Sequence, residues 1–135
     1  MRPEHFNEKD LEHLPGLLGI EVTAVQKGRL EARLKVSKKH LALNGYLHAG
    51  TVVTLADSGA GYGCFANLPE GASGFTTIEL KSNHMGTVTE GSIRCVSECI
   101  HSGRTTQVWE SSIFPGDTEK LLAKFTCTQL ILYPR

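Results

Sequence analysis

The chain has 135 residues, which is enough for one domain with a substantial hydrophobic core. Its 14 basic and 14 acidic residues balance, so the composition excludes the positive charge that marks nucleic-acid binding or attachment to an anionic membrane. The charged N-terminal stretch lacks the apolar segment of a signal peptide, and no window is apolar enough to span a membrane. We therefore expect one cytoplasmic domain, residues 1–135, with its cysteines reduced.

The N-terminal part of the chain is expected to form a short helix and then a β-hairpin. Residues 8–18 have a helical composition that Pro15 and Gly16 interrupt. From residue 19 to residue 36, apolar and polar residues alternate on both sides of a glycine-containing turn. Because a period of two is typical of half-buried strands, this stretch should be a hairpin. Residues 37–47 then form a loop.

The stretch 48–67 is the feature around which the rest of the chain is arranged. It contains no Lys, Arg or Glu and a single acid, Asp57, and its apolar residues fall on every side when it is wound as a helix. A helix that is apolar all round is a buried helix, and its length of about 30 Å is too great for one strand. Gly59, Gly61 and Gly63 each lower helix stability by about 1 kcal/mol, which indicates that another backbone or a ligand comes close there.

Asp57 is the first candidate for a functional residue. An isolated buried carboxylate costs several kcal/mol or becomes protonated, so an acid in such surroundings is rarely accidental. Buried acids with shifted pKa values commonly serve as general bases or nucleophiles. The alternatives are a structural acid that hydrogen-bonds to a neighbouring hydroxyl such as Thr54 or Ser58, and a solvated residue at a poorly buried point.

Four extended segments follow a turn at residues 69–74, at residues 75–85, 90–101, 104–115 and 120–132. They are rich in Thr, Val, Ile and aromatic residues, and the short turns between them imply antiparallel pairing. About six strands with one long apolar helix to cover are most simply arranged as a sheet curled around that helix. This is an α+β fold, in which we expect Trp109 and Phe114 to belong to the core.

The four cysteines do not have the spacing of metal ligands. None forms a C-x-x-C pair, and no His lies close to a pair. Cys95 and Cys99, on one face of an extended strand, would lie about 13 Å apart, too far for one zinc ion. We expect buried small hydrophobic residues and no metal site.

The order of these elements, together with a G-x-x-H-x-G motif and an acid nine residues after its histidine, resembles the hotdog-fold acyl-CoA thioesterases. Gly45, His48, Gly50 and Asp57 carry the motif, and TTIELKSNHM, HSGR and QVWESSIF add to it. The most similar types are the phenylacetate-degradation (PaaI-like) and dihydroxynaphthoyl-CoA thioesterases, relatives of the 4-hydroxybenzoyl-CoA thioesterases. The resemblance covers nearly the whole chain. It implies a hotdog fold and a hydrolase that needs no cofactor, because coenzyme A is part of the substrate.

The resemblance also implies roles for individual residues. Asp57 matches the catalytic carboxylate, His48 and the amide of Ala49 match the motif that polarises the thioester carbonyl, and Thr77 falls where relatives hold the attacking water. From the residues themselves, His48 could instead cap the helix or orient the loop. Residues that match substrate and coenzyme A contacts are Asn44, Gly50, His84, Met85, Gly86, His101, Ser102, Gly103 and Arg104.

Other residues are assigned on weaker grounds. Arg104 and Lys81 are candidate cations for the phosphates of coenzyme A, and Tyr46, Phe65 and Phe75 are candidates for the acyl pocket. Two positions depart from the family pattern. Ala49 replaces the first glycine of H-G-G, and Ala42 stands where many relatives carry Asn or Gln.

The spacing within the helix predicts a dimer. The amides of Ala49 and Gly50 precede Asp57 by about eight residues, or about 12 Å along the axis. A base and an oxyanion donor must both lie within about 3 to 3.5 Å of the reacting atoms. If both residues are catalytic, base and donor should therefore come from different chains, in a homodimer with two shared active sites. The resemblance extends this to a dimer of dimers, a homotetramer, with no nucleic-acid, membrane or metal partner.

The sequence favours hydrolysis of a small aromatic or a short- or medium-chain acyl-CoA. Two other functions stay open. A hotdog dehydratase acting on 3-hydroxyacyl thioesters would need a paired His and carboxylate, and a non-catalytic acyl-CoA-binding module would be indifferent to the loss of Asp57.

Overall fold

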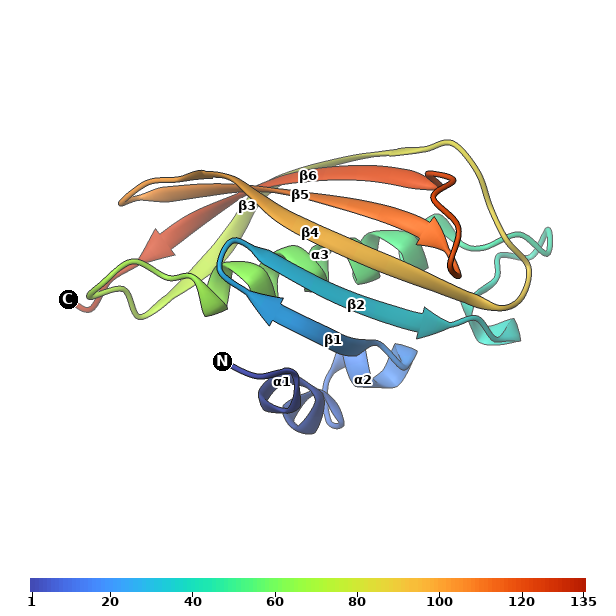
Figure 1. The fold of residues 1–135 in the computed structure, drawn as a ribbon, viewed down its shortest axis with the longest axis horizontal. Coiled ribbons are helices and arrows are strands. Elements are labelled where there is room, and N and C mark those ends of the chain that lie inside the picture. Colours follow the sequence, from blue (N-terminus) through green and yellow to red (C-terminus); the bar gives the residue numbers. More distant parts are fainter.

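The computed structural model describes all 135 residues and shows a six-stranded antiparallel sheet curled around one long helix (Figure 1). The elements in chain order are α1 (Pro3–Asp10), α2 (Leu14–Leu18), β1 (Glu21–Gln26), β2 (Arg29–Lys35), the 3-10 helix η1 (Lys38–His40), α3 (Ala49–Ala66), β3 (Gly74–His84), β4 (Ser92–Ser102), β5 (Thr106–Pro115) and β6 (Ala123–Leu132). Across the sheet the order is β1-β2-β4-β5-β6-β3. The predicted α+β arrangement is confirmed, and no helix has the length and apolar character needed to cross a membrane.

The central helix α3 packs against the sheet at very short range because of its glycines. A Cβ atom added at Gly63 would lie 2.5 Å from the Trp109 ring, and one added at Gly59 would lie 2.5 Å from the Ser97 hydroxyl. These two glycines therefore allow the helix axis to approach β4 and β5 more closely than any side chain would permit.

The expectation that α3 is buried on all sides is wrong for one side of the helix. The side that faces the sheet is buried, but Val53, Thr54, Asp57 and Ser58 on another side are only half-buried. The sheet curls around part of the helix and leaves this side partly open. Of these four residues only Val53 is apolar, so this partly open side of the helix is mainly polar.

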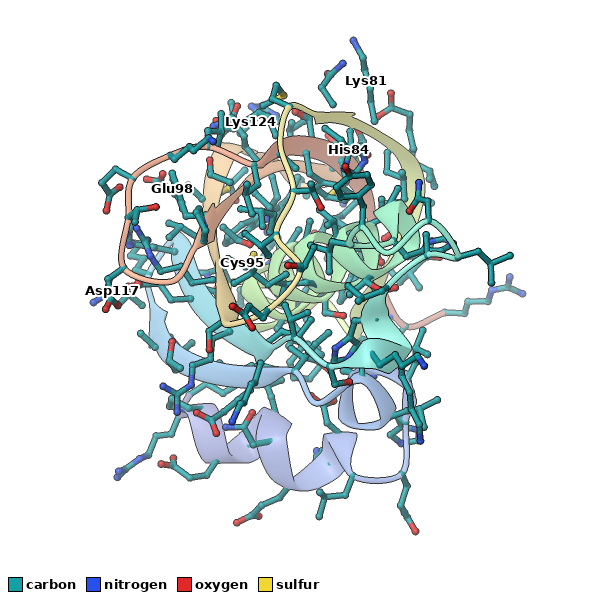
Figure 2. The ribbon with its side chains drawn as sticks, turned by 90° about the vertical axis from the view of Figure 1, so that its right-hand side faces the viewer. Lys81, His84, Cys95, Glu98, Asp117 and Lys124 are labelled. Carbon is teal, nitrogen blue, oxygen red and sulfur yellow. The ribbon has the colours of Figure 1, made fainter.

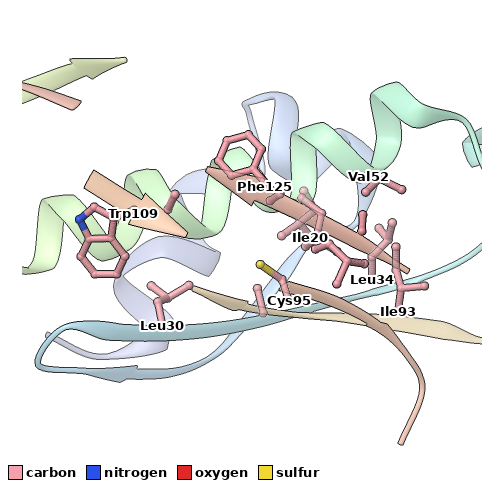
Figure 3. Packing of buried hydrophobic residues seen from close by; sticks show 14 of the residues in the cluster. Ile20, Leu30, Leu34, Val52, Ile93, Cys95, Trp109 and Phe125 are labelled. Carbon is pink, nitrogen blue, oxygen red and sulfur yellow. The ribbon is translucent and has the colours of Figure 1, made fainter. Parts of the chain in front are cut away.

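One hydrophobic cluster of 22 buried residues fills the space between α3 and the sheet. Figure 3 shows Trp109 and Leu30 at one end of it and Leu34, Ile93 and Val52 at the other. Trp109 is fully buried as predicted, and its indole N–H donates to the side-chain oxygen of Gln107 at 2.7 Å.

The prediction that Phe114 belongs to the core is wrong. Alternation along β5 turns Ile113 inward, so Phe114 points to the outer face, where it is half-buried. There the Arg94 guanidinium lies 4.5 Å from its ring centroid, an arrangement that keeps the ring covered on one side.

The N-terminal helices differ from the prediction of one interrupted helix over residues 8–18. The chain forms α1 from Pro3 and α2 from Leu14, and the break lies between Asp10 and Leu14. Pro15 lies in the first turn of α2, where its missing N–H is not needed, so it does not interrupt a helix. Buried Phe6, an apolar anchor outside the predicted range, fixes α1 against the core.

The strand β3 forms one edge of the sheet. It pairs only with β6, through a register that shifts between Thr77 and Glu79. Ile78 is 57% exposed and Leu80 is 44% exposed. A strand of 11 residues with exposed apolar side chains at a sheet edge is a template for pairing with another chain.

The close approach of α3 to the sheet gives a stability prediction. Replacing Gly63 with Ala places a methyl group inside the contact distance of the Trp109 ring, so it should lower the free energy of unfolding by about 1 to 3 kcal/mol, as overpacking does. Urea denaturation followed by circular dichroism measures this change. Gly74→Ala is the matched control, because a Cβ there meets nothing within 4 Å. Equal stability of the two variants would contradict the packing described here.

Candidate active site

The start of α3 presents two hydrogen-bond donors to its surroundings. His48 is the N-cap residue, and its Nδ1 accepts a hydrogen bond of 2.7 Å from the amide of Gly50. A ring nitrogen that accepts carries no proton, so the neutral ring holds its proton on Nε2. His48 is exposed, and its Nε2–H is therefore available as a donor.

The backbone amides at the same helix end are not equivalent. The amide of Gly50, which the sequence placed among the available donors, is already bound to His48. The amide of Ala49 donates to no group in the chain. It therefore lies at the positive end of the helix dipole with its hydrogen free for an acceptor such as a thioester oxygen.

The loop before this helix start is a closed turn. The amide of Ala42 donates to the carbonyl of Tyr46 at 2.7 Å, and the side chain of Asn44 accepts from the amide of Tyr46 at 3.0 Å. Leu43 and Tyr46 are exposed at its tip. Asn44 is thus committed to the turn, and the apolar tip is presented to the outside.

Asp57 lies about two turns further along α3, on the half-buried side. Its side chain forms no hydrogen bond, and Oδ1 is covered from solvent without a partner. The hydroxyl of Thr54 donates instead to the carbonyl of Gly50 at 2.8 Å, and Ser58 makes no bond to the acid. The structural alternative for Asp57 therefore has no support in the chain. Burial raises the pKa of its carboxyl above the ordinary value.

Two buried serines fix the helix directly before Asp57. The Ser111 hydroxyl donates to the backbone carbonyl of Ala56 at 2.9 Å, and the hydroxyls of Ser97 and Ser111 are 2.7 Å apart. Sequence reasoning did not single out these serines. The available signal was their place at inward positions of β4 and β5, where a serine among apolar residues requires a partner.

Thr77 lies on β3 and is half-buried. Its hydroxyl donates to the side-chain oxygen of the fully buried Gln129 at 2.6 Å. The Thr77 proton is therefore already committed, and only its oxygen remains to accept a hydrogen bond from a water molecule. Its role in holding that water stays a prediction.

One group of residues matched to substrate contacts lies at the beginning of α3. The Thr87 hydroxyl accepts from the amide of Leu47 at 3.1 Å, which places the segment after β3 against the loop that carries His48. In Figure 2, which looks onto this end, His84 lies at the same end of the molecule, and Lys81 projects outward away from it. The side chains of His84 and Ser82 are 2.9 Å apart. His84, Met85 and Gly86 thus lie near His48.

The second group lies at the opposite end. His101 and Ser102 end β4, and Gly103 and Arg104 begin its connection to β5, at the left of Figure 1, near the C-terminal end of α3. The Arg104 guanidinium lies 5.7 Å from the ring centroid of Tyr133. An 18-residue helix is about 27 Å long, so one chain does not bring this group to His48.

An aromatic cavity of about 380 Å³ adjoins the C-terminal half of α3. Its lining residues are His5, Phe6, Lys9, Asp10, His13, Tyr62, Phe65 and Phe75. Phe65 and Phe75 meet here as candidates for the acyl pocket, whereas Tyr46 lies elsewhere. A Cβ added at Gly61, one helical turn after Asp57, would lie 3.2 Å from the Phe75 ring, so Phe75 packs against this part of α3.

Sequence reasoning missed the contribution of α1 to this cavity. The Phe6 and Tyr62 rings stack with centroids 4.4 Å apart, and the Tyr62 hydroxyl donates to Asp10. Burial raises the pKa of Asp10 above its ordinary value, and the bond from Tyr62 and the nearby His13 oppose that rise without cancelling it. The only signal in the sequence was an N-terminal aromatic residue outside any predicted element.

An acid without a partner lies on the central helix of a curled antiparallel sheet, and free donors lie at the start of the same helix, which is the arrangement expected above for the thioester-hydrolase class. Comparison with known proteins agrees with this class. The model of the thioesterase superfamily matches residues 44–122, which is more than half of the chain.

Individual relatives match a larger part of the chain than the family model does. The chain is 37% identical over 111 residues to 1,4-dihydroxy-2-naphthoyl-CoA hydrolase of Listeria monocytogenes, covering 82% of this chain and 89% of that protein. It is 32% identical to the enzyme of the same name from Escherichia coli, over 82% of this chain and 81% of that one. A crystal structure of a Haemophilus influenzae thioesterase superposes with a TM-score of 0.91 at 26% identity, covering 98% and 92% of the two chains. The protein belongs to the thioesterase superfamily and has its hotdog fold, as predicted.

The unpaired acid gives a prediction for stability against pH. Because the pKa of Asp57 is raised on folding, the folded state favours the protonated acid. The contribution of protonated Asp57 to the free energy of unfolding is fully present below the ordinary pKa of about 4, and it is lost as the pH rises through the higher pKa of the folded state. Asp57→Asn should therefore raise the free energy of unfolding at pH 7, and the gain should shrink towards pH 3. Urea titrations at several pH values measure it, with the exposed Asp117→Asn as control. A loss of stability at pH 7 would contradict the absence of a partner for Asp57.

Proposed function

We propose that this protein is an acyl-CoA thioesterase in which Asp57 is the general base or the nucleophile. The observation that carries the proposal is a half-buried carboxylate with no hydrogen-bond partner, on the partly open side of α3. The raised pKa makes the ionised acid a stronger base than an ordinary aspartate. Its covered oxygen is also poorly hydrated, which favours attack on an electrophile.

The start of α3 supplies the second requirement of the reaction. As the carbonyl carbon is attacked, its oxygen gains negative charge, and the Nε2–H of His48 and the N–H of Ala49 are placed to donate to such an oxygen. Since the Nδ1 of His48 is bound to Gly50, the ring serves as a donor in a fixed tautomer. This favours the polarising role of His48 over a role as general base.

The chemical steps are those of acyl transfer to water. In one route Asp57 takes a proton from water while the water oxygen bonds to the carbonyl carbon; the C–S bond then breaks, and the departing sulfur of coenzyme A takes up that proton, which returns Asp57 to its ionised form. In the other route an Asp57 oxygen forms the bond, the C–S bond breaks to give an anhydride, and water hydrolyses the anhydride. Both routes give a free carboxylic acid and free coenzyme A.

The aromatic cavity supports an aromatic acyl group as substrate. Phe6, Tyr62, Phe65 and Phe75 offer ring faces, and the two of them that lie on α3, Tyr62 and Phe65, follow Asp57 by five and eight residues. Two relatives are named as hydrolases of an aromatic acyl-CoA, 1,4-dihydroxy-2-naphthoyl-CoA. We infer that the thioester carbonyl lies at Asp57 and the ring in this cavity.

We infer further that the active enzyme is a homodimer, with a dimer of dimers as its larger assembly. Asp57 and Ala49 are eight residues apart on one helix, about 12 Å, and cannot serve one carbonyl. The open apolar edge of β3 and the exposed Leu43 and Tyr46 at the loop tip offer surfaces to a second copy. A dimer also allows His84 of one subunit and Arg104 of the other to contact one coenzyme A molecule.

Loss of the acid should abolish turnover. Asp57→Asn keeps the shape of the side chain but removes its basicity, so the rate of thiol release should fall by at least about 100-fold, the lower range for a catalytic base. The assay uses benzoyl-, hydroxybenzoyl-, dihydroxynaphthoyl-, hexanoyl- and 3-hydroxyacyl-CoA, with Asp117→Asn as control. Wild-type rates in Asp57→Asn would contradict the proposal, and elimination of water from 3-hydroxyacyl-CoA would indicate the dehydratase instead.

The dimer should depend on the edge strand β3. Ile78→Lys places a charge on this edge, so the particle mass measured by light scattering should fall to half that of the wild type or less. Ile100→Lys is the matched control, because Ile100 is 58% exposed and Ile78 57%, but Ile100 lies on β4, away from the edge. An unchanged mass for Ile78→Lys would exclude β3 as the interface.

A further inference from the structure

His40 is a buried histidine that no step of the proposed reaction uses. It is 7% exposed and ends η1, directly after β2. Its Nδ1 accepts from the amide of Ser37 at 2.9 Å, and its Nε2 lies 2.7 Å from the carbonyl of Leu18, the last residue of α2. A backbone N–H faces one ring nitrogen and a backbone C=O faces the other, so only the neutral ring with its proton on Nε2 satisfies both.

The backbone carbonyl of His40 holds the start of α3. It accepts from the amide of His48 at 3.0 Å and from the hydroxyl of Thr51 at 2.9 Å. His48 is the N-cap of α3, and Thr51 lies in its first turn. The ring and the carbonyl of one residue therefore connect α2, the beginning of η1 and the beginning of α3.

We propose that His40 is a positioning residue for thioester hydrolysis; this inference rests on the proposed function. By fixing its own carbonyl between two elements, His40 sets the place of the His48 backbone, and with it the donors at His48 Nε2 and Ala49 N. The loop of residues 41–47 would otherwise move with its exposed tip. A displacement of about 1 Å at a reacting group can lower a rate by about 100-fold.

The proposal predicts a specific division between kcat and KM. The donors at the helix start act most strongly on the charge of the transition state, so their displacement lowers kcat and leaves KM nearly unchanged. His40→Leu removes both ring bonds while filling the space, and its kcat should fall at least tenfold with KM within twofold. His40→Gln offers an acceptor and a donor side by side, as the ring does, and should recover most of kcat. Lys39→Gln, an exposed neighbour on η1, should match the wild type.

A second variant and a second measurement keep the test decisive. Thr51→Val deletes the hydroxyl bond to the His40 carbonyl with little change of shape, so it should also lower kcat. This variant carries the test if His40→Leu does not fold. Amide hydrogen exchange at His48 should become faster in His40→Leu and in Thr51→Val, whether or not any thioester is hydrolysed. Folded variants with wild-type kcat and unchanged exchange at His48 would overturn the inference. If the wild type hydrolyses no thioester, but exchange at His48 is faster in the two variants, the proposed function is overturned and the link from His40 to His48 is not.

Discussion

The separation between an acid and a helix start on one rigid element is the constraint on which the account depends. A helix holds the Ala49 amide and the Asp57 carboxylate about 12 Å apart, and no side-chain rotation closes that gap. One thioester cannot contact both groups of the same chain. The exposed edge of β3, the apolar tip of the loop before α3 and the partly open side of the helix are the surfaces that the proposed second copy of the chain would cover.

The interior explains how the acid is kept in place without a partner. Gly59 and Gly63 let α3 approach β4 and β5, and the Ser111 hydroxyl binds the carbonyl of Ala56, next to Asp57. The helix backbone is therefore held by its buried side, while the carboxylate on another side makes no bond. An ionised acid in that position lowers the stability of the fold, a cost that is common where a group is reserved for catalysis. The surrounding core of Leu30, Trp109 and their neighbours offsets it.

The sequence predicted the main elements because their periodicities are strong. Alternation over residues 19–36 and the apolar stretch 48–67 located the hairpin and α3 to within about two residues. The errors arose where tertiary contacts, rather than local sequence patterns, determine whether an element forms and which side chains are buried. The side chain of Phe6 anchors a helix whose own sequence has little hydrophobic periodicity. Phe114 is aromatic and was expected in the core, but the alternation along β5 directs Ile113 inward and Phe114 outward. The aromatic cavity joins residues more than 50 positions apart, as the bond between Asp10 and Tyr62 shows, and such contacts leave no local signal.

The central claim, that each active site takes its acid from one subunit and its carbonyl donor from the other, is tested most directly by mixing two inactive variants. Asp57→Asn removes the acid, and Ala49→Pro removes the donor N–H at the first helical position, where proline is well tolerated. After the subunits are allowed to exchange, about half of the dimers are mixed, and each has one complete site. The account predicts recovery of about one quarter of the wild-type rate of thiol release. If the mixture stays as inactive as its parents although mass spectrometry shows mixed dimers, the shared site is wrong.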